Sequence, residues 1–399
     1  MQNDVERTGR SRLASVLALE PNVVAVAVAM FLLAAGENLW KKFLPKLLEA
    51  LGAPVVAIGL YGSIHDLLDG LYQYPGGWIS DRYGRKKALQ LFVLLAALGY
   101  LIYAVTPRWE LVFAGLLFVM AWQSMASPTL FAVIGDALPR ERRAMGFTVQ
   151  SILKRIPIAI APIIGGLLIA RHGSVSGIRI ALVVAIVLAI VTLLVVSRIR
   201  ITLPEAEPLR IGGVWRTFPR PLRSLLLSDV FIRTCEGLVD VFLVLYAINI
   251  VGVSPTRFGV LIAIQTITAI LVYLPAARIA DRIGRKPFVI ATFLAFSLFP
   301  LAVVLSSSFA DLAFAFVIGG LREIGEPARK ALIIDLSDER LRARSVGLYY
   351  LIRSVAIAPS AVAGGLLWRF SPDLPFYVAL VIGLAGTVLF AATVREEYA

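Results

Sequence analysis

The hexapeptide Asp81-Arg82-Tyr83-Gly84-Arg85-Lys86 returns as Asp281-Arg282-Ile283-Gly284-Arg285-Lys286, displaced by 200 residues. Each copy ends the second long apolar segment of its half of the chain. Other pairs keep the displacement to within one residue: Pro75 with Pro275, Pro128 with Pro327, Asp136 with Asp335, and Glu37 with Glu236. The repeat predicts two homologous halves built on the same plan.

Long apolar segments flank both copies of the hexapeptide. Hydrophobic residues make up 59% of the 399 positions and charged residues only 16%, which is too apolar for a water-soluble domain. At about 1.5 Å per residue, a helix over each segment crosses a hydrocarbon layer of roughly 30 Å. The predicted fold class is therefore an all-α polytopic membrane protein, with twelve transmembrane helices in two pseudo-symmetric six-helix bundles. The segments lie near residues 22–48, 54–80, 88–106, 110–136, 144–170, 176–197, 222–250, 256–280, 287–306, 310–335, 345–368 and 374–394.

The loops between these segments suggest the domain organisation and the orientation. We expect a first bundle at residues 1–197, a proline-containing cytoplasmic linker at 198–221 and a second bundle at 222–399. Lysine and arginine gather in alternate loops, so the positive-inside rule places both termini in the cytoplasm, most simply at a prokaryotic cell (inner) membrane. This rule also accounts for the formal charge of +13 without a nucleic-acid partner. Residues 1–20 mix acids and bases and are not expected to form a cleavable signal peptide.

The pattern Gly77-x-x-x-Asp81-Arg82-x-Gly84-Arg85-Lys86 resembles the signature loop of the major facilitator superfamily, and the second half repeats it with Ala277 in place of the first glycine. The resemblance covers nearly the whole chain in helix count and repeat. It implies two bundles around a central cavity that opens alternately to each side. It also implies a cytoplasmic gate containing Gly77, Asp81, Arg82, Gly84, Arg85, Lys86, Asp281, Arg282, Gly284, Arg285 and Lys286. The alternative is that the bases of these loops only fix the topology.

The fifth segment contains Ala161-Pro162-Ile163-Ile164-Gly165-Gly166, which resembles the tail of a motif found in drug-proton antiporters of this superfamily. The upstream glycines of that motif are absent. The resemblance therefore favours export only modestly, and close packing of helices at small residues explains the same stretch.

Many charged residues lie inside the apolar segments. A charge at the centre of a bilayer costs about 2.5–3.5 kcal/mol on insertion scales, so such residues face a cavity or one another. At about 100° per residue, Asp229, Arg233, Glu236 and Asp240 form one narrow stripe. Either these charges form structural or gating ion pairs, or some of them line a substrate cavity. The candidates for the cavity are Glu37, Lys41, Lys154, Arg155, Arg233, Glu236, Asp240, Arg322, Glu323, Glu326 and Arg353.

The second segment carries His65, Asp66 and Asp69 near its middle, on a helix face about 100° wide. Two carboxylates three positions apart disfavour double ionisation, and a neighbouring imidazole is able to relay a proton. These three residues are therefore the predicted proton-coupling site. A hydrogen-bonded polar patch that holds the second helix in place is the competing interpretation.

The sequence contains no P-loop, nucleophile elbow or cysteine cluster, and Cys235 is its only cysteine, so we expect no enzyme, cofactor or metal. The function predicted is secondary active transport of a small polar, charged or amphiphilic solute by alternating access, with proton-coupled export favoured over proton-coupled uptake. A receptor or scaffold without transport, on the same fold, is the alternative from a different class. The expected partners are the solute, protons and the lipid bilayer, and the chain is expected to act as a monomer.

Overall fold

The computed structural model describes residues 21–127, 129, 130, 133, 140–198, 218–337 and 342–394. In the first half its helices are α2 (Pro21–Trp40), η1 (Lys41–Phe43), α3 (Leu44–Ala50), α4 (Val55–Tyr83), α5 (Arg85–Val105), α6 (Glu110–Met120), η2 (Ala121–Met125), α8 (Arg140–His172) and α9 (Ser174–Val196). In the second half they are α10 (Arg220–Val239), η4 (Asp240–Phe242), α11 (Leu243–Leu245), η5 (Tyr246–Ile250), α12 (Pro255–Ile283), α13 (Lys286–Val304), α14 (Phe309–Leu321), α15 (Glu326–Asp335), α16 (Arg342–Ile357), α17 (Pro359–Trp368) and α18 (Leu374–Thr393). Within the described residues, each of the predicted segments contains one helix or consecutive helices, so the all-α fold class is confirmed.

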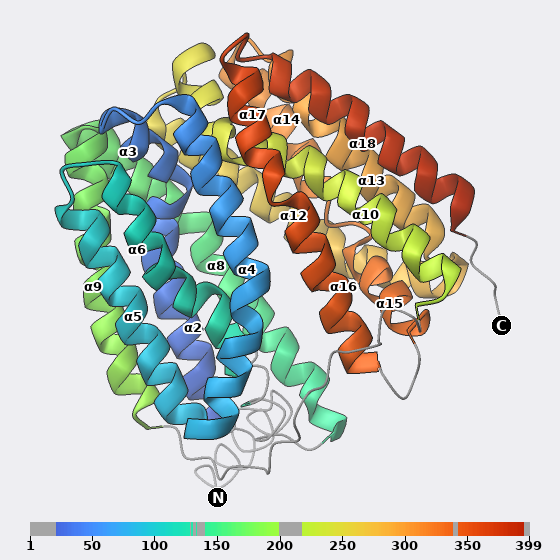
Figure 1. The fold of residues 1–399 in the computed structure, drawn as a ribbon, viewed down its shortest axis with the longest axis horizontal. Coiled ribbons are helices and arrows are strands. Elements are labelled where there is room, and N and C mark those ends of the chain that lie inside the picture. The colour runs from blue at the N-terminus through green and yellow to red at the C-terminus, as the bar shows by residue number, and fades with distance from the viewer. Residues whose placement is uncertain are drawn as a thin grey trace, which may run out of the picture.

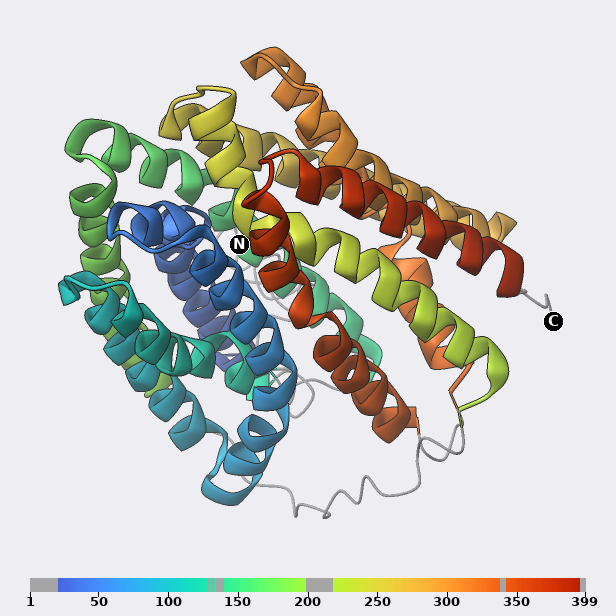
Figure 2. The same ribbon diagram turned by 45° about the horizontal axis from the view of Figure 1, so that its top comes forward.

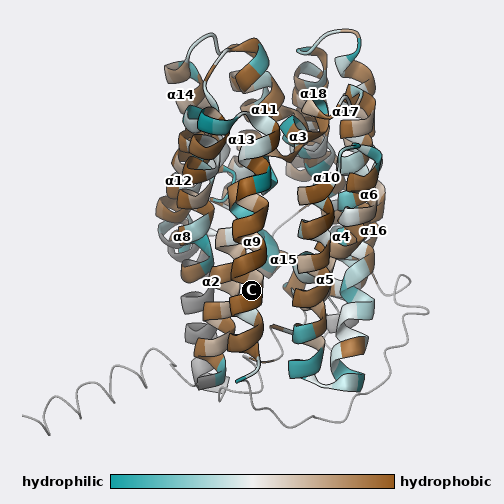
Figure 3. Ribbon diagram, turned by 90° about the vertical axis from the view of Figure 1, so that its left-hand side faces the viewer, coloured by the Kyte–Doolittle hydropathy of each residue, from teal (hydrophilic) through white to brown (hydrophobic). Residues whose placement is uncertain are grey.

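Eight helices of the described part are long and apolar enough to cross a membrane. Figure 3 shows hydrophobic residues along the middle of the helices and hydrophilic residues gathered at their ends. Helices α4 and α10 are not among the eight, because each carries charged side chains in its interior. The chain is therefore an integral membrane protein with several spans, some of them interrupted by charge.

The backbone repeats in the two halves as the sequence predicts. Gly84 and Gly284 each end a helix with positive φ, at +95° and +106°, and Gly52 and Gly252 do so at +84° and +79°. An added Cβ disfavours this left-handed region, so the hexapeptide turn requires its glycine. The first helix of each half also breaks at a matched place, after Trp40 (φ −122°) and after Val239 (φ −121°), into the 3₁₀ turns η1 and η4.

The helices α2–α9 form one group and α10–α18 form a second group (Figure 1). The two groups meet at the upper end of Figure 1 and diverge toward the lower end, and Figure 2 shows the same arrangement from another side. Helix α8 packs against α12, and α4 packs against α16 and α17. The turn at Gly84 lies at the diverging end, and we call this end the signature end. The division at residues 198–221 stays a prediction, since residues 199–217 lie outside the described part.

Small residues bring the two groups into contact away from the signature end. A Cβ added at Gly59 of α4 would overlap the backbone of Ala361 in α17, and one added at Gly166 of α8 would overlap the carbonyl of Pro255 in α12. The tail of the antiporter-like motif thus lies where two backbones touch, as close packing at small residues predicts.

Candidate functional site

The second half holds a buried network of charges between α10, α15 and α16. Arg329 donates to Asp229 at 2.7 Å and to Glu326 at 2.8 Å, and it is 1% exposed. Arg233 donates to Glu326 and to Glu236, each at 2.8 Å. Every carboxylate in the network therefore has at least one guanidinium partner, which is how buried ions are normally stabilised.

Two more arginines complete this network. Arg322 donates to Glu236 at 3.2 Å and lies over the rings of Phe296 and Phe299, each with its guanidinium carbon 4.8 Å from the centroid. Arg353 reaches Asp229 at 3.3 Å. We call the set the second-half cluster; its members are Asp229, Arg233, Glu236, Arg322, Glu326, Arg329 and Arg353.

The first half holds a hydrogen-bonded set of different character. Glu37, 8% exposed, accepts from Tyr100 Oη at 2.7 Å and from Gln123 Nε2 at 3.4 Å. The Gln123 Oε1 atom in turn accepts from Lys41 Nζ at 2.8 Å and lies 3.1 Å from His65 Nε2. A neutral amide therefore connects the acid of α2 to two basic side chains.

The same set continues along α4. His65 Nδ1 lies 3.3 Å from Asp66 Oδ1, and Asp69 accepts from Ser124 Oγ at 2.6 Å. We call the whole set the first-half cluster; its members are Glu37, Lys41, His65, Asp66, Asp69, Tyr100, Gln123 and Ser124. Among the side chains that the structure describes, no lysine or arginine forms an ion pair with Glu37, Asp66 or Asp69.

The local backbone explains how Gln123 and Ser124 both reach this set. They lie in the π-helical turn η2, where the wider turn changes the direction of successive side chains. Single π-helical turns within α-helices are frequent at functional sites. None of Gln123, Ser124 and Tyr100 was predicted from the sequence, because neutral polar residues in an apolar segment give no charge signal.

Three predicted candidates form bonds between the two groups of helices. Lys42 Nζ lies 3.2 Å from both carboxylate oxygens of Asp240. Arg155 donates to Glu323 at 3.1 Å, and its guanidinium lies over the ring of Tyr273. These ion pairs connect η1 with η4 and α8 with the turn after α14.

The helical period assumed for the second half was wrong at Asp240. Helix α10 ends at Val239, so Asp240 leaves the stripe of Asp229, Arg233 and Glu236 and points to Lys42 instead. The tenth segment is also not one helix, because a non-helical turn at residues 322–325 separates α14 from α15, just before Pro327.

The gate candidates lie at the signature end. Arg85 donates to Asp81 within the first hexapeptide and to Ser80 at 2.9 Å. In the second copy Arg285 pairs with Asp335, a residue in the repeat register with Asp136. Lys286 donates to the carbonyl of Ala391 at 2.8 Å. The side chain of Asp281 lies outside the described part, as do all atoms of Asp136.

The remaining gate and cavity candidates have fewer contacts. Gly77 lies inside α4, and the Arg82 guanidinium packs over Trp78 and Tyr83. Arg282 is in the last turn of α12, and Lys86 is in the first turn of α5. Lys154 is an exposed residue of α8.

Two repeated helical groups with charged side chains between them are the arrangement found in membrane transporters of the parallel-repeat type. The sequence profile of the Major Facilitator Superfamily matches residues 26–249 and 225–399. The chain belongs to this superfamily.

Relatives of this chain agree with that assignment. An uncharacterized transporter of the superfamily from Methanocaldococcus jannaschii, MJ1317, is 21% identical, and the match covers 93% of this chain and 94% of the relative. The multidrug resistance protein MdtH of Yersinia enterocolitica is 25% identical over 86% of each chain. The crystal structure of the nucleoside transporter NupG shares the fold, with a TM-score of 0.76, 12% identity and coverage of 94% of this chain and 100% of that one.

Proposed function

We propose that this protein exports a small polar, charged or amphiphilic solute by alternating access, in exchange for protons that bind the first-half cluster. Both termini and the signature end are then cytoplasmic, as the positive-inside rule predicts, so the end at which the two groups of helices diverge faces the cytoplasm. The likeness to MdtH, a multidrug resistance protein, supports export.

The observation that carries the proposal is that no arginine or lysine among the described side chains forms a direct ion pair with Glu37, Asp66 or Asp69. Lys41 acts on Glu37 and Asp69 only at longer range. A carboxylate without such a partner exchanges a proton without breaking an ion pair, whereas the acids of the second-half cluster would have to break one. Proton uptake therefore belongs in the first half, and the second half supplies a fixed charged framework.

The candidate roles follow from this division. His65, between Gln123 and Asp66, is placed to pass a proton along α4. Lys41 and Lys154 are candidates for an anionic group of the solute. Arg353 is a third candidate, and a solute bound there would have to compete with its ion pair to Asp229. Arg155, Asp240 and Glu323 form ion pairs between the two helical groups, and solute binding there would have to compete with those pairs.

The test begins by finding a ligand, because the geometry does not identify one. Purified protein is screened by thermal shift against drugs and metabolites, since a ligand at 100 times its Kd adds about 2.7 kcal/mol of stability. Each ligand found is then followed in liposomes that contain a trapped pH-sensitive dye. An exporter that exchanges its solute for protons should show solute movement coupled to proton movement in the opposite direction.

The Asp69→Asn variant should lose accumulation driven by a pH gradient and keep solute exchange at equilibrium. Glu110→Gln, at an exposed acid of α6 outside the cluster, is the matched control and should behave like the wild type. Intact pH-driven transport in the Asp69 variant would remove that residue from the coupling site. Binding without flux would favour a receptor, and proton movement in the same direction as the solute would show uptake.

The gate is tested separately. Asp81→Asn removes the acceptor for Arg85 and should slow transport while the protein remains inserted in the membrane. Asp281→Asn should have a smaller effect, because its copy of the signature lacks the leading glycine. Equal transport rates for the Asp81 variant and the wild type would contradict the gate role.

A further inference from the structure

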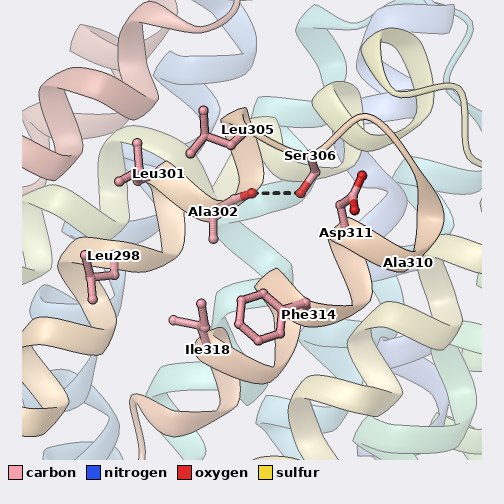
Figure 4. A pocket seen from close by; sticks show the side chains of 9 residues that line it. All are labelled: Leu298, Leu301, Ala302, Leu305, Ser306, Ala310, Asp311, Phe314 and Ile318. Carbon is pink, nitrogen blue, oxygen red and sulfur yellow. Dashed lines mark hydrogen bonds between the residues drawn. The ribbon is translucent and has the colours of Figure 1, made fainter.

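A groove on the outside of the second half lies between α13 and α14 (Figure 4). Its volume is about 480 Å³, and apolar side chains dominate its lining: Leu298, Leu301, Ala302, Leu305, Phe314 and Ile318. Leu305 and Phe314 are each 67% exposed in the protein alone. Since α13 is one of the apolar helices long enough to span a membrane, these side chains face lipid, and the groove opens to the bilayer.

A single carboxylate stands at the rim of this groove, where α14 begins. Asp311 Oδ2 accepts from Ser308 Oγ at 2.8 Å, from the Ser307 backbone amide at 3.1 Å and from Ser307 Oγ at 3.2 Å. All of these bonds end on one oxygen, so within the described part Oδ1 keeps its acceptor capacity. The Ser306 hydroxyl, also at the rim, already donates to the carbonyl of Ala302 at 2.7 Å.

We propose that the groove binds one acyl chain of a phospholipid whose primary ammonium headgroup donates a hydrogen bond to Asp311 Oδ1. The apolar walls match a hydrocarbon chain, and the acid at the membrane-surface end of the groove matches a cation held next to that chain. A primary ammonium meets both requirements, because it carries the charge and has N–H donors. A quaternary ammonium has the charge alone, and an anionic headgroup is repelled.

The first half offers a natural comparison at the same displacement of 200 residues. Ile102 stands where the second half has Ala302, and Leu111 stands where it has Asp311. The Ile102 side chain packs toward α6, with Cγ2 3.2 Å from a Cβ built on Gly115. The first half therefore lacks the small residue, and the acid at the start of α6, Glu110, lies one position away and pairs with Arg108 at 3.6 Å, so one lipid site per chain is expected.

The experiment is native mass spectrometry of the full-length, delipidated protein with added phosphatidylethanolamine, phosphatidylcholine or phosphatidylglycerol carrying identical chains. Because the contact with Asp311 is exposed and screened by water, phosphatidylethanolamine should bind only about two- to fivefold more tightly than phosphatidylcholine. Phosphatidylglycerol should bind most weakly. Asp311→Asn should remove the preference for phosphatidylethanolamine and leave phosphatidylcholine unchanged.

Ala302→Trp fills the groove and should lower retention of all three lipids by about tenfold or more. If that variant does not fold, Phe314→Ala, which removes one exposed wall, should lower all three in the same direction. Glu110→Gln, an exposed acid at the start of α6, is the matched control and should bind lipids as the wild type does. Equal retention of phosphatidylethanolamine and phosphatidylcholine by the wild type, or undiminished retention after either groove substitution, would overturn the proposal.

Discussion

In the first half Glu37 accepts from the neutral amide of Gln123, whereas in the second half Glu236 accepts from the guanidinium of Arg322. Both contacts join residues that correspond at a displacement of 199 positions, and each acid lies four residues before the first residue of a matched 3₁₀ turn. One scaffold thus carries an acid with a neutral partner and an acid with a charged one. The repeat fixes the backbone, and one side chain in each half, Gln123 or Arg322, decides whether the acid meets a neutral amide or a guanidinium.

The second-half cluster contains the carboxylates of Asp229, Glu236 and Glu326, each bonded to at least one arginine. Mutual pairing offsets the cost of burying these charges, and it also makes protonation of any one acid costly. The first-half cluster uses a tyrosine, an amide and a serine as donors instead. Neutral donors tolerate either protonation state of a carboxylate, because none of them loses an ionic partner.

The largest expected effect is on stability, at the centre of the second-half cluster. Arg329→Met removes the shared partner of Asp229 and Glu326 and should destabilise the protein by about 3–5 kcal/mol. In this buried setting, among the described guanidinium groups that donate hydrogen bonds, Asp229 would keep only Arg353, at 3.3 Å, and Glu326 would keep only Arg233. Thermal unfolding of the purified protein measures the loss. The same substitution at Arg108, whose side chain is 73% exposed, is the control and should change stability by less than about 0.5 kcal/mol.

The next prediction contrasts the two corresponding acids. Glu236→Gln leaves Arg233 and Arg322 each short of one carboxylate and should cost about 1–3 kcal/mol of stability. Glu37→Gln keeps an acceptor for Tyr100 and should cost less than about 1 kcal/mol, yet it should abolish transport driven by a pH gradient. Equal stability losses in the two variants, or proton-driven transport that survives in Glu37→Gln, would show that the halves do not differ in this way.

The sequence was sufficient for the helices, the repeat and the glycine turn. Apolar segment length and the displacement of 200 residues predicted these features, because helix formation in lipid and the left-handed conformation at Gly84 are local requirements. On α10, α15 and α16 the sequence also predicted Arg233, Glu236, Glu326 and Arg353 as candidates, and it placed Asp229 on the charged stripe. Arg329, at the centre of the second-half cluster, was not among the candidates. Which acid meets which base was not visible, since pairs such as Arg233 with Glu326 depend on how distant helices pack.

Two features of the site were missed for a more specific reason. The period of 100° per residue holds only inside a regular helix. The 3₁₀ turn at Asp240 therefore moves that side chain away from the predicted stripe. The π-helical turn at Gln123 likewise turns a side chain toward the first-half cluster that the period did not place there. Gln123 is also neutral, and a search for buried charge passes over it. The repeat contained a usable signal, because the position of Gln123 corresponds to that of Arg322.

A third prediction exchanges the residue that distinguishes the halves. Gln123→Arg places a guanidinium beside Glu37, as Arg322 stands beside Glu236, and should hold Glu37 in an ion pair. Proton-driven transport should fall by about tenfold or more, which corresponds to about 1.4 kcal/mol. Gln123→Met, which removes the amide without adding charge, is the control, and it should retain more transport than the arginine variant. Lower proton-driven transport by Gln123→Met than by Gln123→Arg would contradict this difference between the halves.

The smallest expected effect concerns the ion pair that joins the halves, Lys42 with Asp240. Both side chains are more than a third exposed, at 37% and 40%, so solvent screens the pair and its coupling energy should be about 0.2–1 kcal/mol. A double-mutant cycle with Lys42→Met and Asp240→Asn isolates that coupling from the other contacts of each residue. A weak pair at this place suits a contact that must open when the halves change position, whereas a strong pair would hold one state. The cycle is therefore measured twice, by thermal unfolding and by the rate of solute exchange in liposomes.

A coupling above about 2 kcal/mol would place Lys42 and Asp240 with the fixed pairs of the second-half cluster. No coupling in the exchange rate would show that the bond seen between η1 and η4 does not take part in the transport cycle.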